Sequence, residues 1–141
     1  MNTMNARAQR VLVIGIGSFG TALVETLHRN GAEVIVIDEN ASSLDGVKDL
    51  AAHAVVADGT DPRVLQAVEA PACDMAVVTF GEDFEASVLA VAALKKLGVR
   101  EIAARAVNQR QQDVLLAVGA TRVIQLEIEG GRRLADEIVK R

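Results

Sequence analysis

Three glycines near the start of the chain have the residue type and spacing of a phosphate-binding turn. Gly15, Gly17 and Gly20 follow the apolar run 10–14 in a G-x-G-x-x-G arrangement, and a helix-like segment comes directly after them. In such a turn the first glycine allows a sharp bend. The second lets a phosphate approach bare backbone, and the third lets the new helix pack against the strand. The free N–H groups at the helix start attract an anion.

Glycine turns occur in many loops, so the glycines alone are weak evidence for a phosphate-binding site. Asp38 strengthens that interpretation. The β-branched run Glu33 to Asp38 ends in this carboxylate, about 20 residues after the glycines, where dinucleotide-binding units place an acid that accepts hydrogen bonds from ribose hydroxyls. A carboxylate at this point also repels a 2′-phosphate and so disfavours NADP. The alternative interpretation of Asp38 is an ordinary turn residue at a strand end.

A second polar turn, Asp58-Gly59-Thr60, follows the expected third strand. Third strands of this kind open onto the ligand crevice, so Asp58 and Thr60 are candidates for contact with the adenine side of a nucleotide. A plain turn is the open alternative. Asp61 before Pro62 predicts a helix cap followed by proline at the first helical position, so Asp61 is interpreted as structural.

Strands and helices must alternate along the chain to position these residues. Apolar runs predict six strands, each followed by a helix with apolar residues at helical spacing. The expected strands are 10–14, 33–38, 54–57, 75–80, 101–106 and 122–126. Six such units predict an α/β fold with a Rossmann-like, doubly wound six-stranded parallel sheet, helices on both faces and strand order 3-2-1-4-5-6.

Composition agrees with a single domain and excludes several function classes. The chain has 141 residues, half of them hydrophobic, with no Trp or Tyr and three Phe, so a core of Val, Ile, Leu and Ala is expected. The formal net charge of −4 and the lack of aromatic stacking residues disfavour nucleic-acid binding. One cysteine rules out an internal disulfide and, with two histidines, a Cys/His metal cluster.

The same residues give little support for catalysis. A dehydrogenase needs a proton donor or acceptor beside the nicotinamide. Without Tyr a Tyr-Lys pair is impossible; His28 falls late in the first helix, and His53 precedes the third strand at the far end of the sheet. Cys73 has no nearby cation in sequence that would lower its pKa. The chain is therefore predicted to bind a nucleotide without transforming it.

Two helices and the N-terminus carry further expectations. The helix predicted at 84–97 is apolar most of the way round, so it is either sandwiched in the core or covered by a second subunit. The helix predicted at 129–141 has Leu134 and Ile138 on its apolar side and either packs on its own sheet or reaches a partner. Residues 1–9 are predicted to be a flexible leader, with no signal peptide and no membrane-inserting segment.

Five segments together resemble the RCK (KTN, TrkA-N) domain of Ktr/Trk-type potassium transport regulatory subunits. They are Gly-Ile-Gly-Ser-Phe-Gly at 15–20, the strand end at Asp38, His-Ala-Val-Val-Ala-Asp-Gly-Thr-Asp at 53–61, Ala-Val-Val-Thr-Phe-Gly at 76–81 and Val-Gly-Ala-Thr-Arg-Val-Ile at 118–124. The resemblance covers residues 10–141, as an RCK N-terminal nucleotide-binding domain with no C-terminal RCK lobe. It implies a cytoplasmic subunit peripheral to the inner face of the cell membrane.

The resemblance also implies ligands and roles. ATP or ADP is the expected cofactor, with NAD(H) as another and with Mg or Ca accompanying ATP. Gly15, Gly17 and Gly20 would face the phosphates, Arg105 is the basic residue after the fifth strand, and Glu127 would help to hold the divalent cation. The full expected contact set is Gly15, Ile16, Gly17, Ser18, Phe19, Gly20, Asp38, Glu39, Asp58, Gly59, Thr60, Thr79, Gly81 and Arg105, with Glu127 for the metal.

The sequence departs from the family pattern at Ser18, where Ktr-type members often have an arginine that reaches the terminal phosphate. The departure weakens the expectation of ATP-specific recognition. The resulting hypothesis is a non-enzymatic subunit that binds an adenine nucleotide, forms homodimers and a higher ring, and controls a membrane-embedded potassium-translocating subunit. The alternative is the nucleotide-binding domain of an NAD-dependent oxidoreductase that lacks its substrate domain.

Overall fold

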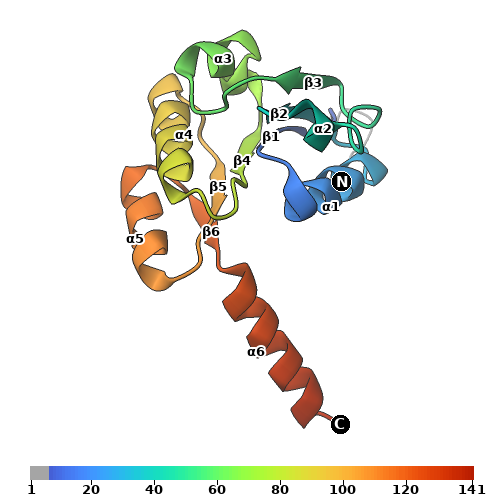
Figure 1. The fold of residues 1–141 in the computed structure, drawn as a ribbon, viewed down its shortest axis with the longest axis vertical. Coiled ribbons are helices and arrows are strands. Elements are labelled where there is room, and N and C mark those ends of the chain that lie inside the picture. Colours follow the sequence, from blue (N-terminus) through green and yellow to red (C-terminus); the bar gives the residue numbers. More distant parts are fainter. Residues whose placement is uncertain (1–6) are drawn as a thin grey trace.

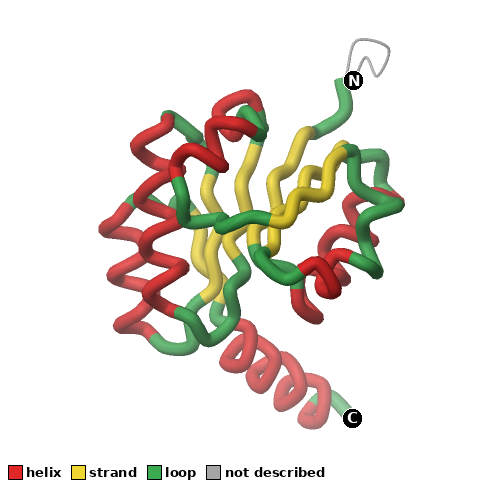
Figure 2. Tube along the Cα trace, turned by 45° about the horizontal axis from the view of Figure 1, so that its top comes forward, coloured by secondary structure: helices red, strands yellow, loops and turns green. Residues whose placement is uncertain are grey.

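Six parallel strands form the centre of the protein (Figures 1 and 2). The computed structural model describes residues 7–141; residues 1–6 of the predicted leader lie outside the described residues. The strands are β1 (Arg10–Ile14), β2 (Glu33–Asp38), β3 (His53–Val56), β4 (Met75–Val78), β5 (Ile102–Arg105) and β6 (Arg122–Ile124). Their order in the sheet, β3-β2-β1-β4-β5-β6, confirms the predicted doubly wound topology.

Helices lie on both faces of this sheet, and the last one projects away from it (Figure 2). They are α1 (Gly17–Arg29), α2 (Ala41–Leu44), α3 (Pro62–Ala67), α4 (Phe84–Leu97), α5 (Gln109–Val118) and α6 (Leu126–Val139), with a short 3-10 turn, η2 (Ala70–Ala72). Alternation along β1 divides the core in two. Leu12 and Ile14 belong to the cluster with α3, α4 and α5, whereas Val11 and Val13 belong to the cluster with α1 and α2. Each fully buried aliphatic side chain contributes about 1.5–3 kcal/mol to folding.

The two sides of the sheet are wound in opposite directions from its middle. β1 and β4 are neighbours, but β1 leads into α1 on one face and β4 leads into α4 on the other. The chain therefore diverges at the carboxyl ends of these two strands. In open α/β sheets this divergence leaves the crevice in which ligands bind.

Side-chain caps begin four of the helices. Asn40, Asp61, Asp83 and Asn108 each accept a backbone N–H from the first turn of the helix that follows. The cap at Asp61 agrees with the prediction from the sequence, and Pro62 follows it at the start of α3. Such a cap is worth about 1 kcal/mol, so the polar residues between strands determine where each helix starts.

α2 is shorter than the apolar pattern predicted. Leu44, Val47 and Leu50 suggested one helix, but α2 ends at Leu44 and residues 45–50 form irregular turns. Gly46 lies in the middle of this stretch, and glycine is a poor helix former. Leu44 and Val47 nevertheless remain buried in the core against β1 and β2.

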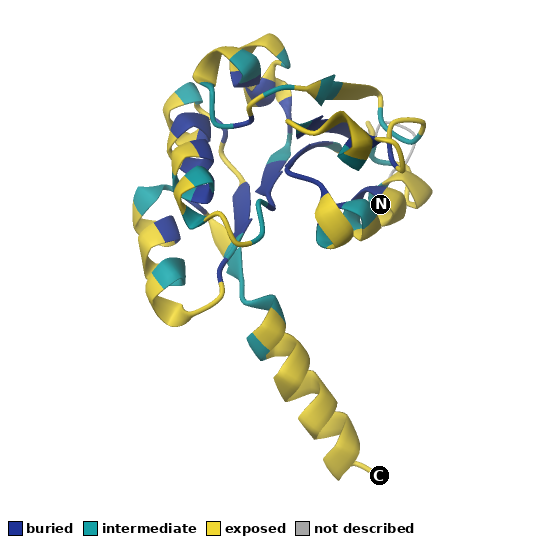
Figure 3. Cartoon of the chain, in the orientation of Figure 1, coloured by how far each residue is buried: buried dark blue, intermediate teal, exposed yellow. Residues whose placement is uncertain are grey.

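α4 and α6 resolve differently. One side of α4 is buried within its own chain, with Ala90, Val91 and Leu94 in the cluster that contains α3 and α5, whereas Leu89 on the other side is 50% exposed. α6 begins at Leu126, three residues before its predicted start, and projects from the body with no buried residue (Figures 1 and 3). Packing of the final helix on its own sheet is therefore not what the structure shows. Across residues 7–141, no helix is both long enough and apolar enough to cross a membrane.

Candidate functional site

The glycine turn lies at the carboxyl end of β1, where the sheet changes its winding direction. Gly15 has a φ of +80°, which favours glycine, and a Cβ on it would come within 3.2 Å of the backbone of Thr79. A Cβ on Gly20 would lie 3.0 Å from the carbonyl oxygen of Gly15. Beside Gly17 there is open space within 4 Å. The turn is therefore tight behind and open in front, as a phosphate would require.

Asp38 is held against this turn from the end of β2. Its carboxylate accepts the backbone N–H of Ile16 at 2.9 Å and that of Asn40 at 2.8 Å. Each carboxylate oxygen has a further lone pair, so Asp38 can also accept hydrogen bonds from a ligand hydroxyl. The two backbone contacts orient the carboxylate before any ligand arrives.

A hollow opens between the turn and the ends of β4 and β5. Its lining consists of Gly15, Ile16, Gly17, Ser18, Phe19, Asp38, Thr79, Phe80, Gly81 and Arg105. All of these except Phe80 were in the expected contact set. Phe80 was missed because an aromatic residue beyond an apolar strand is indistinguishable in sequence from core; it is half-buried, and its ring approaches Gly15.

Arg105, the last residue of β5, brings a positive charge into this hollow. One amino nitrogen of its guanidinium lies 3.1 Å from Glu127 Oε1. The guanidinium carbon, Cζ, lies 6.0 Å from the centroid of the Phe19 ring. Its Nε is buried with no hydrogen-bond partner among the described residues. A buried donor without a partner costs free energy that a ligand oxygen would recover.

Acidic side chains make up half of the lining of an adjoining hollow. Its lining consists of Glu39, Asp58, Thr60, Phe80, Asp83, Glu85, Ala86 and Leu89. Asp58 Oδ1 accepts both the backbone N–H of Thr60, at 2.9 Å, and its hydroxyl, at 2.7 Å. Asp58 and Thr60 therefore form a local turn and line the crevice at the same time. Asp83, which caps α4, and Glu85 in its first turn were missed, because only the fold brings the start of this helix to the end of β3.

Three members of the expected set do not line either hollow. Gly20 and Gly59 are buried, and a Cβ on Gly59 would lie only 2.3 Å from Ile14 Cγ2, so Gly59 lets its loop approach β1. Glu127, at the start of α6, is exposed and paired with Arg105. Among the described residues no group of three or more His, Cys, Asp or Glu side chains is arranged to hold a metal ion. The side chains present therefore do not by themselves form a metal site.

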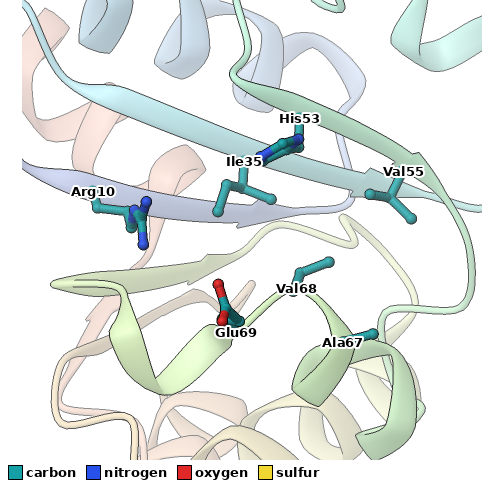
Figure 4. A pocket seen from close by; sticks show the side chains of 7 residues that line it. All are labelled: Arg10, Ile35, His53, Val55, Ala67, Val68 and Glu69. Atoms are coloured by element: carbon teal, nitrogen blue, oxygen red, sulfur yellow. The ribbon is translucent and has the colours of Figure 1, made fainter.

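The other candidates for chemistry lie elsewhere. His28 is exposed at the end of α1, and Cys73 is buried, which raises the pKa of its thiol and disfavours the reactive thiolate. His53 lies in a separate pocket at the amino ends of the strands, with Arg10, Ile35 and Glu69 (Figure 4). The Arg10 guanidinium in that pocket is already bound to Glu33 at 3.0 Å.

These features define a Rossmann-like class of domain: a doubly wound sheet, a glycine turn at the switch point and an acid at the end of β2. A family model for the TrkA-N domain matches residues 11–126. The chain belongs to the TrkA-N domain family.

Two curated relatives come from Bacillus subtilis. The chain is 35% identical over 127 residues to "Ktr system potassium uptake protein C", covering 90% of this chain and 58% of the relative. It is 32% identical over 126 residues to "Ktr system potassium uptake protein A", covering 89% of this chain and 57% of the relative. The chain thus spans somewhat over half the length of the curated relatives it matches.

Solved structures share the fold. The TrkA-N domain of the inner membrane protein ybaL from Escherichia coli superposes with a TM-score of 0.82 at 22% identity, over 92% of this chain and 96% of that one. The Shewanella denitrificans Kef C-terminal domain in its AMP-bound form has a TM-score of 0.77 at 22% identity, over 94% and 80%. The GsuK channel bound to NAD has a TM-score of 0.73 at 18% identity, over 86% and 22%.

Proposed function

We propose that this chain is the adenine-nucleotide-binding domain of a cytoplasmic regulatory subunit that controls a membrane-embedded potassium transporter or channel. The observation that carries the proposal is the carboxylate of Asp38, held by two backbone N–H groups beside an open glycine turn. A ribose on Asp38 would place the attached phosphate over the start of α1.

The potassium transport role rests on the family and on the two Ktr system relatives. ATP, ADP and NAD(H) are the candidate ligands, and solved structures of the same fold include the GsuK channel bound to NAD and the Kef C-terminal domain bound to AMP. Neither hollow is lined by His, Lys, Tyr or Cys. Of the carboxylates that do line them, Asp38, Asp58 and Asp83 already accept backbone N–H groups, which favours a binding role over proton transfer.

A thermal-shift panel of ATP, ADP, NAD, NADH and NADPH tests this proposal. A ligand at a hundred times its dissociation constant should stabilise the folded chain by about 2.7 kcal/mol. Asp38→Ala should lose most of that shift. Asp49→Ala, which removes an exposed carboxylate that lines neither hollow, should keep it. If no nucleotide raises the melting temperature of the wild-type chain, the sensor proposal is wrong.

The proposed divalent cation has its own test at Glu127. This carboxylate forms an ion pair with Arg105, and no group of three or more metal-binding side chains surrounds it among the described residues. A divalent cation would therefore have to be held jointly by Glu127 and the ligand phosphates. If it is, Glu127→Gln should reduce the gain in ATP affinity that magnesium gives. An unchanged gain would mean that Glu127 only pairs with Arg105.

A further inference from the structure

We propose that the crevice selects adenosine ligands with few phosphate charges over ATP. The preferred unit is an adenosine 5′-monophosphate, either free as AMP or as one half of NAD(H). This inference rests on the proposed function and adds the ligand class to it. The distribution of charged groups around the two hollows carries it.

The start of α1 provides positive potential for a small number of phosphates. α1 begins at Gly17 with no side-chain cap and no acidic residue in its first turn, and the space beside Gly17 is open. The first N–H groups of the helix are therefore available to an anion. The effect of a helix N-terminus falls off within one turn, so it serves the phosphate that touches the turn and not an extended chain of three.

Arg105 is the one cationic side chain among the described residues that line the two hollows. Its side chain is only 20% exposed, and one amino nitrogen is already shared with Glu127 at 3.1 Å. Its unpartnered Nε offers one further donor. A guanidinium that is neutralised in this way can assist one phosphate oxygen, but it cannot balance a triphosphate.

Five carboxylates surround the same space. Asp38 lines the hollow at the glycine turn, and Glu39, Asp58, Asp83 and Glu85 line the adjoining one. Two are fixed in place: Asp38 binds two backbone N–H groups, and Asp83 caps α4 through the N–H of Ala86 at 3.0 Å. These charges cannot easily turn away from a ligand.

Each phosphate added to the ligand therefore meets more negative charge than positive charge. Like charges a few ångströms apart repel even in water, and a cleft of one sign concentrates the effect. We expect ATP to bind on the order of tenfold more weakly than AMP when no divalent cation is present. Ser18 lies on the open side of the turn and is exposed. A cationic side chain at this position would therefore offset the repulsion between the added phosphates and the carboxylates.

Isothermal titration of the whole chain in low salt with EDTA tests the inference, using AMP, NAD, NADH, ADP and ATP. AMP or NAD(H) should bind more tightly than ADP, and ADP more tightly than ATP. Salt at about 0.5 M should narrow the difference between AMP and ATP. The relative affinities of AMP and NAD(H) show whether the ligand is a free mononucleotide or a dinucleotide. The inference holds whichever of the two binds more tightly.

Ser18→Arg, with Ser18→Gln as an uncharged control of similar length, tests the charge explanation directly. The arginine should raise ATP affinity about tenfold more than it raises AMP affinity, and the glutamine should not. Circular dichroism checks that both variants fold; if Ser18→Arg does not fold, the salt dependence of the wild-type chain decides. ATP binding at least as tightly as AMP and NAD(H) overturns the inference and leaves the proposed function standing. Binding of no nucleotide at all overturns the proposed function.

Discussion

The hydroxyl of Thr79 donates a hydrogen bond to the carbonyl oxygen of Gly15. The backbone N–H of Thr79 donates to the carbonyl oxygen of Ile14 at 2.8 Å, so two bonds join the end of β4 to the end of β1. Thr79 is buried, with 5% of its surface exposed. It was expected to contact the ligand, and the structure shows that it also braces the glycine turn from behind.

Replacement of Thr79 by valine tests this brace. The valine keeps the branched shape but removes the donor and leaves the Gly15 carbonyl without it, so the free energy of unfolding should fall by about 1–3 kcal/mol. Thr79→Ser retains the hydroxyl and should lose less. Urea denaturation measures both variants. An unfolding free energy of Thr79→Val equal to that of the wild type would show that the hydrogen bond does not stabilise the turn.

Gly59 gives a second prediction, on the loop that follows β3. A Cβ at this position would lie 2.3 Å from Ile14 Cγ2, so Gly59→Ala should destabilise the chain by about 1–3 kcal/mol through forced repacking. Gly46→Ala is the matched control, because a Cβ there meets nothing within 4 Å and its φ is not positive. The control should be neutral or slightly stabilising. Thermal or urea unfolding measures the stability of both variants. Equal stability of Gly59→Ala and Gly46→Ala would contradict the prediction.

Asp74, just before β4, gives a prediction about pH. Its hydrogen bond with Arg7, assisted by the backbone N–H of Arg10 at 2.8 Å, lowers the pKa of Asp74 from 3.8 to about 2. Because the folded pKa is the lower one, the ionised carboxylate stabilises the fold above about pH 4, and this contribution disappears as pH falls through 2.

Urea unfolding of wild type and Asp74→Asn between pH 2 and pH 6 measures this contribution. The difference in unfolding free energy should be constant at the upper end and shrink below about pH 4. Asp49→Asn is the control, since the Asp49 side chain makes no hydrogen bond or ion pair within residues 7–141. A wild-type advantage that persists unchanged down to pH 2 would contradict the assignment.

The exposed apolar side of α6 gives a prediction about assembly. Leu134 and Ile138 are 58% and 57% exposed, although they lie on one side of the helix. If a second copy of the chain covers them in the homodimer expected from the sequence, Leu134→Glu with Ile138→Glu should convert the dimer to monomer and leave the fold intact. Arg132→Glu, on the other side of the helix, should not. Light scattering measures the mass, and a wild-type monomer at high concentration would remove the dimer proposal.

The sequence predicts the sheet well, because its physical signals are local. The apolar runs that become β1 and β2 are buried on both faces, so they read as continuous hydrophobic segments, and their loops begin with caps such as Asn40 and Asp61. Boundaries fail where a local signal is weak: Gly46 cuts α2 short, and the final helix starts at Leu126 within what read as a strand.

The candidate site is predicted less completely, for a related reason. The glycines and Asp38 follow their own strands and form a motif that can be read along the chain. Asp83 and Glu85 reach the crevice only because α4 starts beside the end of β3, and the pairing of Arg105 with Glu127 joins residues on β5 and α6. Such relationships depend on the arrangement of elements and not on a local pattern.

That last pairing links the first turn of α6 to the crevice. The helix has 14 residues, is attached to the body at its first turn, and there carries Glu127, which is bound to Arg105. Fourteen residues extend about 21 Å, so a tilt of roughly 10° at the root moves the tip by about 4 Å. If a ligand phosphate draws Arg105 away from Glu127 and the root of α6 tilts, the displacement would be larger at the far end of the helix, where Val139 is 84% exposed.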